Sequence, residues 1–147
     1  RTLQNGYAID NINYAISCLY YFLGSLKYLG QFKDKANKES GRDIIDRSVK
    51  YIRENIESDI TIKSICEHVG YSESYFSSLF RKQTGFTPVH YIQHLRIQTA
   101  CNLLDFSEMK INQVSCKVGI SDPYYFSRLF SRITGLTPTE YRKNKKG

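Results

Sequence analysis

The sequence predicts an all-α protein in which two similar helical units are joined by a long connecting helix and preceded by an apolar N-terminal helix. Apolar residues recur at helical spacing along most of the chain; in residues 126–133 they lie at i, i+3, i+4 and i+7. Glycine and proline fall between these segments, where turns are expected. One long stretch also occurs twice, about 50 residues apart.

This repeat is the most informative feature of the sequence. Residues 119–142 read GISDPYYFSRLFSRITGLTPTEYR, and residues 70–92 read GYSESYFSSLFRKQTGFTPVHYI. The copies align at an offset of 50 from Tyr75 onward, but the glycines that open them, Gly70 and Gly119, are 49 apart, so the second turn has one extra residue. A solenoid is the alternative explanation, but solenoids generally need three or more units and only two are visible.

Length and composition limit the classes of protein to which this chain can belong. The 147 residues indicate one domain, or one domain with a fragment of another, and the net charge of +7 permits an acidic partner such as nucleic acid. No signal peptide is visible, and the longest apolar run, residues 18–23, is too short to span a bilayer. The cysteines have no metal-ligand spacing and are expected to be reduced packing residues of a cytoplasmic protein. They are Cys18, Cys66, Cys101 and Cys116.

Residues 1–40 are expected to contain a helix at 9–32 and a polar linker from residue 31. The apolar residues of the helix step by four and three, as in a heptad seam, and aromatic residues make its other faces apolar too. The seam consists of Ile12, Ile16, Leu19, Leu23 and Leu26. Because a helix this apolar does not stand alone in water, it either packs on another domain or pairs with a second copy of itself.

Capping residues and periodicity predict the helices that follow. They are expected at residues 42–57, 62–69, 73–84, 88–105, 111–118 and 123–134, with a short one from residue 138. The first should bury Ile45, Val49, Ile52 and Ile56. Thr61 and Asp122 are predicted N-caps, and Pro88 and Pro123 suit first helical positions. A short helix, a glycine turn and a second helix form a helix-turn-helix, here in units at about residues 61–85 and 111–135.

Paired helix-turn-helix units on a joining helix, ending in GxSDPYYFSRLF and TGLTPTEYR, resemble the DNA-binding domain of the AraC/XylS family of bacterial transcription regulators. The resemblance covers about residues 43–143. It implies an all-helical DNA-binding domain at residues 41–147 that binds double-stranded promoter DNA and usually activates transcription, here of metabolic genes such as those for sugar utilisation. It also implies RNA polymerase as a partner, a homodimer of the full-length protein, and residues 1–40 as the tail of an upstream regulatory and dimerisation domain.

The residues expected to contact DNA lie on the outward faces of the two repeated helices. They are Ser74, Ser77, Ser78, Arg81 and Lys82 in the first helix, and Tyr124, Ser127, Arg128, Ser131 and Arg132 in the second. Arg128 is expected to bind a guanine through two hydrogen bonds, whereas serines discriminate little between bases. Arg81, Lys82, Arg132 and the lysines of a basic tail at residues 142–146 are expected to contact phosphates or to be solvated charges. Tyr75 and Tyr125 are expected to be core residues.

The connecting helix sets the distance between these surfaces. A helix of about 17 residues is about 26 Å long. It can hold two recognition helices roughly one DNA turn, about 34 Å, apart. A rigid helix also fixes this separation, which favours DNA that bends to meet both units.

Other groups of residues in the sequence say less about function. His90 and His94 lie at i and i+4, but no third zinc ligand has suitable spacing, so they are expected to be a surface pair. Arg96 is expected either to contact a phosphate or to pair with a carboxylate. No catalytic or cofactor-binding motif is present, which predicts a protein that is not an enzyme and has no cofactor.

Two alternatives remain open. One keeps the DNA-binding module as the output domain of a two-component response regulator, with residues 9–40 as the connecting helix. The other is a helical protein-interaction module without DNA affinity. Such a module would lack the salt dependence that phosphate contacts produce.

Overall fold

The computed structural model describes residues 41–145, and every regular element in that range is a helix. The helices are α2 (Gly41–Glu54), α3 (Ile62–Val69), α4 (Glu73–Thr84), α5 (Pro88–Phe106), α6 (Ile111–Lys117), α7 (Pro123–Thr134) and α8 (Pro138–Lys145). The predicted all-α class is confirmed, whereas the predicted helix at residues 9–32 lies outside the described residues. No helix within 41–145 is long and apolar enough to cross a membrane.

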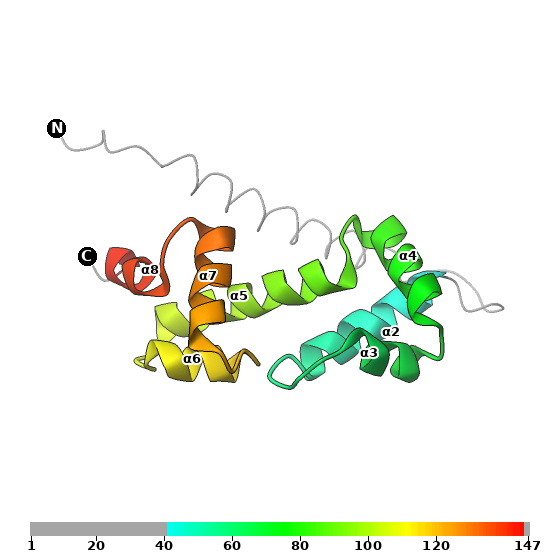
Figure 1. Cartoon of the computed structure of the whole chain (residues 1–147), viewed down its shortest axis with the longest axis horizontal. Helices are drawn as coiled ribbons and strands as arrows, with labels where there is room; N and C mark the ends of the chain where they lie inside the picture. Colours follow the sequence, from blue (N-terminus) through cyan, green and yellow to red (C-terminus); the bar gives the residue numbers. More distant parts are fainter. Residues whose placement is uncertain (1–40, 146–147) are drawn as a thin grey trace.

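The helices form two lobes joined by α5 (Figure 1). The N-lobe comprises α2, α3, α4 and the first half of α5, and the C-lobe comprises the second half of α5 with α6, α7 and α8. Each lobe has its own core. The N-lobe core is Ile44, Ile45, Ile52, Ile65, Cys66, Val69, Phe76, Phe80 and Ile92, and the C-lobe core is Ile97, Ala100, Cys101, Leu104, Val114, Val118, Ile120, Phe126, Leu129 and Phe130.

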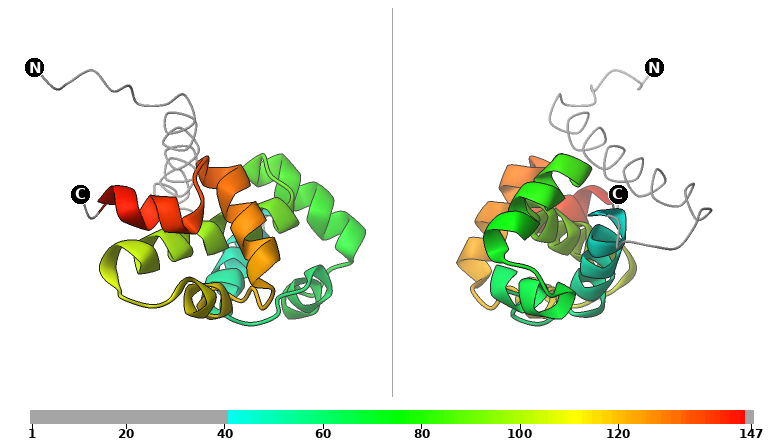
Figure 2. Two further views of the ribbon diagram at one scale, coloured as in Figure 1. Left: turned by 60° about the vertical axis from the view of Figure 1, so that its left-hand side comes forward. Right: turned by 90° about the vertical axis from the view of Figure 1, so that its right-hand side faces the viewer.

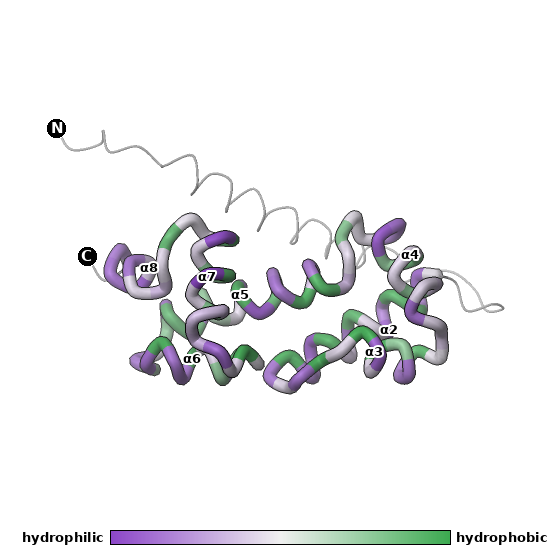
Figure 3. The backbone as a smooth tube through the Cα atoms, viewed as in Figure 1, coloured by the Kyte–Doolittle hydropathy of each residue, from purple (hydrophilic) through white to green (hydrophobic). Residues whose placement is uncertain are grey.

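The connecting helix therefore serves both cores. Ile92 near its start packs in the N-lobe, whereas Ile97 and the apolar residues after it pack in the C-lobe. Hydrophobic and hydrophilic positions alternate along the helices, and α8 is hydrophilic over most of its length (Figure 3). An amphipathic pattern of this kind directs one side of each helix to a core and leaves the other in solvent.

The two repeated helices, α4 and α7, have the predicted bounds because local capping chemistry defines both ends. The Ser72 hydroxyl accepts a hydrogen bond from the backbone N–H of Tyr75 at 3.4 Å, and the Asp122 carboxylate accepts one from Tyr124 at 2.8 Å. Gly85 and Gly135 end the helices with φ of 82° and 78°, a left-handed conformation that favours glycine. The sequence repeat is thus a structural repeat.

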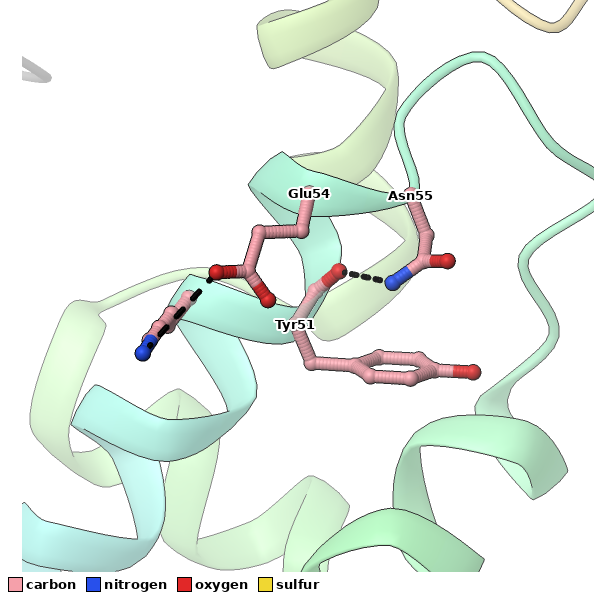
Figure 4. Close-up of polar contacts among 4 residues, drawn as sticks. Tyr51, Glu54 and Asn55 are labelled. Atoms are coloured by element: carbon pink, nitrogen blue, oxygen red, sulfur yellow. Dashed lines mark hydrogen bonds and ion pairs between the residues drawn. The ribbon is translucent and has the colours of Figure 1, made fainter.

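The end of α2 differs from the prediction. The helix stops at Glu54, three residues before the predicted Glu57. The side-chain amide of Asn55 donates to the carbonyl of Tyr51 at 2.9 Å (Figure 4), and the backbone N–H of Asn55 donates to the same carbonyl at 3.1 Å, so the two bonds close the last turn. As a result Ile56 leaves the helix and is only half-buried. The buried face of α2 is shifted toward its start and includes Ile44 and Ser48, which were not predicted, while Val49 is half-buried.

Smaller differences concern helix ends and one cysteine. The connecting helix continues to Phe106, and α6 ends at Lys117. Cys66 and Cys101 are buried as expected, but Cys116 is exposed and is not a packing residue. Cys116 lies on the outer side of α6, since the neighbouring Val114 and Ser115 are the buried residues of that helix.

Candidate nucleic-acid interface

The second helix of each helix-turn-helix unit presents an outward face on the same side of the molecule. Viewed along the long axis, α4 and α7 lie on one side and α2 lies on the other (Figure 2). The joining helix α5 has 19 residues, which corresponds to about 28 Å. The length of α5 therefore limits how far apart the two outward faces can lie.

The inner faces of α4 and α7 are anchored by phenylalanines. Phe76 and Phe80 in α4, and Phe126 and Phe130 in α7, are completely buried. Because these residues fix the rotation of each helix, they also determine which side chains face outward. The outward face of each helix is therefore set by the lobe core.

The predicted contact residues lie on this outward face. Ser74, Ser78, Arg81 and Lys82 of α4 and Tyr124, Arg128 and Arg132 of α7 are exposed, whereas Ser77, Ser127 and Ser131 are half-buried. The Ser127 hydroxyl donates to the carbonyl of Pro123 at 2.9 Å, so part of its hydrogen-bonding capacity is used within α7. The structure brings the ten residues together as two patches, one on each lobe.

The arginines of these patches differ in their contacts. The guanidinium of Arg128 makes no hydrogen bond or ion pair with the described residues. That of Arg132 donates to the side-chain oxygen of Gln93 on α5 at 3.4 Å. Of the two exposed arginines of α7, Arg128 is therefore the one whose guanidinium has no such contact among the described residues.

Tyr75 and Tyr125 are not core residues, contrary to the prediction. Their side chains are 49% and 39% exposed, and Tyr124 beside Tyr125 is 82% exposed. Tyr75 stacks on Tyr71 with ring centroids 5.3 Å apart, and the Tyr125 hydroxyl accepts a hydrogen bond from Gln93 at 2.9 Å. Helical spacing could have predicted the exposure of both tyrosines, because a residue next to a buried phenylalanine is rotated about 100° away from the core.

Arg96 makes a contact that the sequence did not predict. Its guanidinium donates to the backbone carbonyl of Ser58 at 2.6 Å, across 38 residues of sequence. Burial lowers the pKa of this guanidinium, and the neighbouring Asp59 and Tyr125 oppose that effect. Arg96 is thus a structural contact between α5 and the loop at residues 55–60.

Histidine and basic side chains outside the two patches also make contacts within the domain. His94 is half-buried beside Phe86, and burial lowers its pKa, with further lowering by the positive charges of His90 and Arg132. Within the described range there is no group of three side chains suited to a metal ion. Arg142, predicted to begin a basic tail, instead donates from a half-buried position to the carbonyl of Met109 at 2.6 Å.

Comparisons with known proteins agree with this geometry. A family model described as a helix-turn-helix domain matches residues 46–144. The chain belongs to the AraC-type helix-turn-helix family. The MmsAB operon regulatory protein of Pseudomonas aeruginosa is 33% identical over 121 residues, which cover 82% of this chain and 38% of that protein. The chain spans between 28% and 38% of the lengths of the first three curated relatives that it matches.

Solved structures share the AraC-type fold. A transcriptional regulator with an AraC-type DNA-binding domain from Chromobacterium violaceum has a TM-score of 0.67 and 26% identity, covering 74% of this chain and 96% of that one. The C-terminal domain of AraT, a response regulator from Geobacillus stearothermophilus, has a TM-score of 0.67 and 28% identity, covering 69% and 84%. The resemblance to the AraC/XylS family noted in the sequence is therefore confirmed.

Proposed function

We propose that this chain is the DNA-binding part of a bacterial transcription regulator that activates metabolic genes by inserting α4 and α7 into two successive major grooves of promoter DNA. The observation that carries this proposal is the duplicated recognition helix, with both copies on one side of the molecule (Figure 2). A single unit would explain DNA binding, but two units held by one helix explain why the chain has an internal repeat. The relatives named as a lactose operon transcription activator and as the transcriptional activator RhaR support the activator role.

The two surfaces have different roles in this proposal. Arg128 binds a guanine through two hydrogen bonds, because it is exposed and has no competing contact among the described residues. Arg81 and Lys82, in the last turn of α4, contact phosphates and set the position of the domain on the duplex. Arg132 reaches a phosphate by giving up its long hydrogen bond to Gln93.

The proposal also covers parts of the full-length protein that lie outside the described residues. The apolar helix predicted at residues 9–32 mediates homodimerisation or docking to the regulatory domain, and RNA polymerase is the partner of the DNA-bound regulator in the bacterial cytoplasm. Sedimentation of the chain with and without a Leu19→Lys, Leu23→Lys change tests the first point. Loss of a concentration-dependent dimer supports self-association, and a chain that is monomeric at high concentration contradicts it.

The salt dependence of DNA binding tests the proposal directly. A duplex selected from a random-sequence library by this protein serves as the probe. The logarithm of its association constant should fall linearly with the logarithm of salt concentration over about 50–200 mM, because phosphate contacts release counterions. Lys82→Ala should reduce this slope by about 1. Lys50→Ala, which removes the same charge from α2, should leave it unchanged.

Either of two results would contradict the proposal. A flat salt response would favour the protein-interaction module. A slope that Lys50→Ala reduces and Lys82→Ala leaves unchanged would mean that DNA does not bind on the side formed by α4 and α7.

A further inference from the structure

The two lobes touch at a second place besides α5. The loop at residues 55–60, which follows α2, lies against the turn between α6 and α7 (Figure 1). At Gly119 in this turn, an added Cβ would be 2.7 Å from the carbonyl oxygen of Ile56 and 3.0 Å from that of Ser58. The backbones are therefore so close that any side chain at Gly119 would force them apart.

Two charged side chains reinforce this contact. The guanidinium of Arg96 donates to the Ser58 carbonyl at 2.6 Å and lies 2.8 Å from the position of a Cβ at Gly119. It therefore connects α5 to the loop at the point where the loop meets the turn. At the end of α6, the Lys117 ammonium is 2.8 Å from the carboxylate of Glu57.

The loop moves with the N-lobe because its own hydrogen bonds hold it there. Asn55 caps α2 through the carbonyl of Tyr51, and the backbone N–H of Ser58 donates to the Asn55 carbonyl at 2.9 Å. Ile56 and Ile60 pack against the N-lobe core. The loop is thus a fixed extension of the N-lobe.

The turn is held equally firmly by the C-lobe. The backbone N–H of Ile120 donates to the Ser115 carbonyl at 3.0 Å, and the Ser115 hydroxyl donates to the carbonyl of Ile120. Ile120 is buried in the C-lobe core. A contact between the loop and the turn is therefore a contact between two independently packed bodies.

We propose that this second contact between the lobes fixes the orientation of α7 relative to α4 and so selects DNA sites by the spacing of their two half-sites. The contact is formed by residues 55–60, Arg96, Lys117 and Gly119, and it is called here the interlobe clamp. With α5 alone, the orientation of one lobe relative to the other depends on how each lobe packs on its half of that helix. A second contact away from the axis of α5 opposes rotation of one lobe about that axis. Arg96 is accordingly a positioning residue, and the part of the inference that concerns DNA rests on the proposed function.

The first helix-turn-helix unit shows that the clamp is not a general feature of the turn. An added Cβ at Gly70, the counterpart of Gly119, would have no neighbour within 4 Å. Both glycines have positive φ, 82° at Gly70 and 74° at Gly119. The left-handed backbone conformation explains why both positions are glycine. Of the two, Gly119 is the one that the other lobe approaches closely.

A measurement without DNA tests the mechanical part. In the full chain with Cys18→Ser and Cys116→Ser, nitroxide labels at Glu67→Cys in α3 and Lys143→Cys in α8 report the distance between the lobes by electron–electron double resonance. The parent should give a narrow distance distribution, and Arg96→Met should broaden it severalfold. Arg47→Met is the matched control, because Arg47 also donates to a backbone carbonyl, that of Val69 at 3.2 Å, but within the N-lobe. This control should not broaden the distribution.

A charge exchange provides a second variant on the surface, where folding is not at risk. Lys117→Glu places two carboxylates together and should broaden the distribution, and adding Glu57→Lys should narrow it again. An unchanged distribution in both Arg96→Met and Lys117→Glu would overturn the inference. So would a parent distribution that is already broad.

A second measurement tests spacing selection. The probe is a duplex selected by the parent protein, compared with the same duplex carrying one extra base pair between its half-sites, which rotates one half-site by about a tenth of a turn. The parent should lose affinity on insertion, and Arg96→Met should lose severalfold less. Equal losses would overturn the DNA part of the inference. If the parent protein gives a narrow distance distribution but binds no duplex, the proposed function is contradicted and the clamp is still supported.

Discussion

The two helix-turn-helix units have nearly the same interior. The buried pairs Phe76–Phe80 and Phe126–Phe130 have ring centroids 5.4 and 5.7 Å apart. A tyrosine from the following helix meets the second phenylalanine edge-on in each unit, at 5.4 and 5.5 Å. These ring distances therefore agree between the two units to within a few tenths of an ångström.

The outward sides of the same helices differ. At equivalent positions α4 carries Ser78 where α7 carries Arg128, and Glu73 where α7 carries Pro123. The turns differ as well, since only the second of the two contacts the other lobe at its glycine. The comparison shows that packing fixes one side of a recognition helix and leaves the other side available for a different function in each unit.

The largest expected effect tests the equality of the interiors. Phe80→Ala and Phe130→Ala should each lower the free energy of unfolding by about 3–5 kcal/mol, because both remove a fully buried ring. Urea denaturation of the two variants measures this. A Phe130→Ala protein that melts like the parent but no longer binds DNA would show that this residue faces the DNA and not the core.

The turn glycines test the difference between the units. Gly70→Ala should cost about 1–2 kcal/mol, since it places an L-residue in the left-handed region. Gly119→Ala should cost more, because its Cβ would also overlap the carbonyl oxygens of Ile56 and Ser58. Thermal or urea denaturation gives both values. Equal losses would mean that the loop at residues 55–60 yields easily to the added methyl group.

The outward faces are compared by removing equivalent side chains. Arg128→Ala should weaken binding to a selected duplex by about 1–3 kcal/mol and relax the preference at one base pair. Ser78→Ala should cost less, about 0.5–1.5 kcal/mol at most, as expected for one neutral hydrogen bond. Quantitative binding to duplexes altered at single positions measures both effects. Uniform weakening by Arg128→Ala on all sequences would identify Arg128 as a phosphate contact.

Local chemistry explains which parts of the fold were predictable. Both ends of α4 and α7 follow from residues within the helix or beside it, namely Ser72, Asp122, Gly85 and Gly135, so their bounds were predicted to the residue. The end of α2 was misplaced because it depends on a side-chain amide at Asn55, and the apolar spacing of Ile56 continues the helical pattern past it. Periodicity records which residues are apolar, not where the backbone leaves the helix.

Long-range contacts explain what the sequence did not reveal at the candidate interface. The partner of Arg96 is a backbone carbonyl 38 residues away, and a carbonyl has no sequence signature. Arg142 is similar, since its partner is the carbonyl of Met109. By contrast, the exposure of Tyr75 and Tyr125 was predictable from helical geometry, because each precedes a phenylalanine already assigned to the core.

The smallest expected effect concerns a titratable group that the first unit has and the second lacks. His94 on α5 lies beside Phe86, whereas the equivalent position on α8 is Asn144. Burial lowers the pKa of His94 below its ordinary value of about 6.5, and the positive charges of His90 and Arg132 lower it further. The unfolded chain therefore binds a proton at a higher pH than the folded protein does.

Stability should consequently fall as the pH decreases from about 6.5 through the lowered pKa of His94, and it should not change further from this source once the folded protein is also protonated. His94→Gln should remove this component, so the difference in free energy of unfolding between about pH 7.5 and pH 5 should be smaller than in the parent. His90→Gln should have an intermediate effect, because it removes one of the positive charges that oppose protonation of His94 but leaves the burial in place. Urea denaturation at the two pH values measures all three proteins. If His94→Gln has the same acid sensitivity as the parent, the acid-sensitive group lies elsewhere, and the difference between His94 and Asn144 has no consequence for stability.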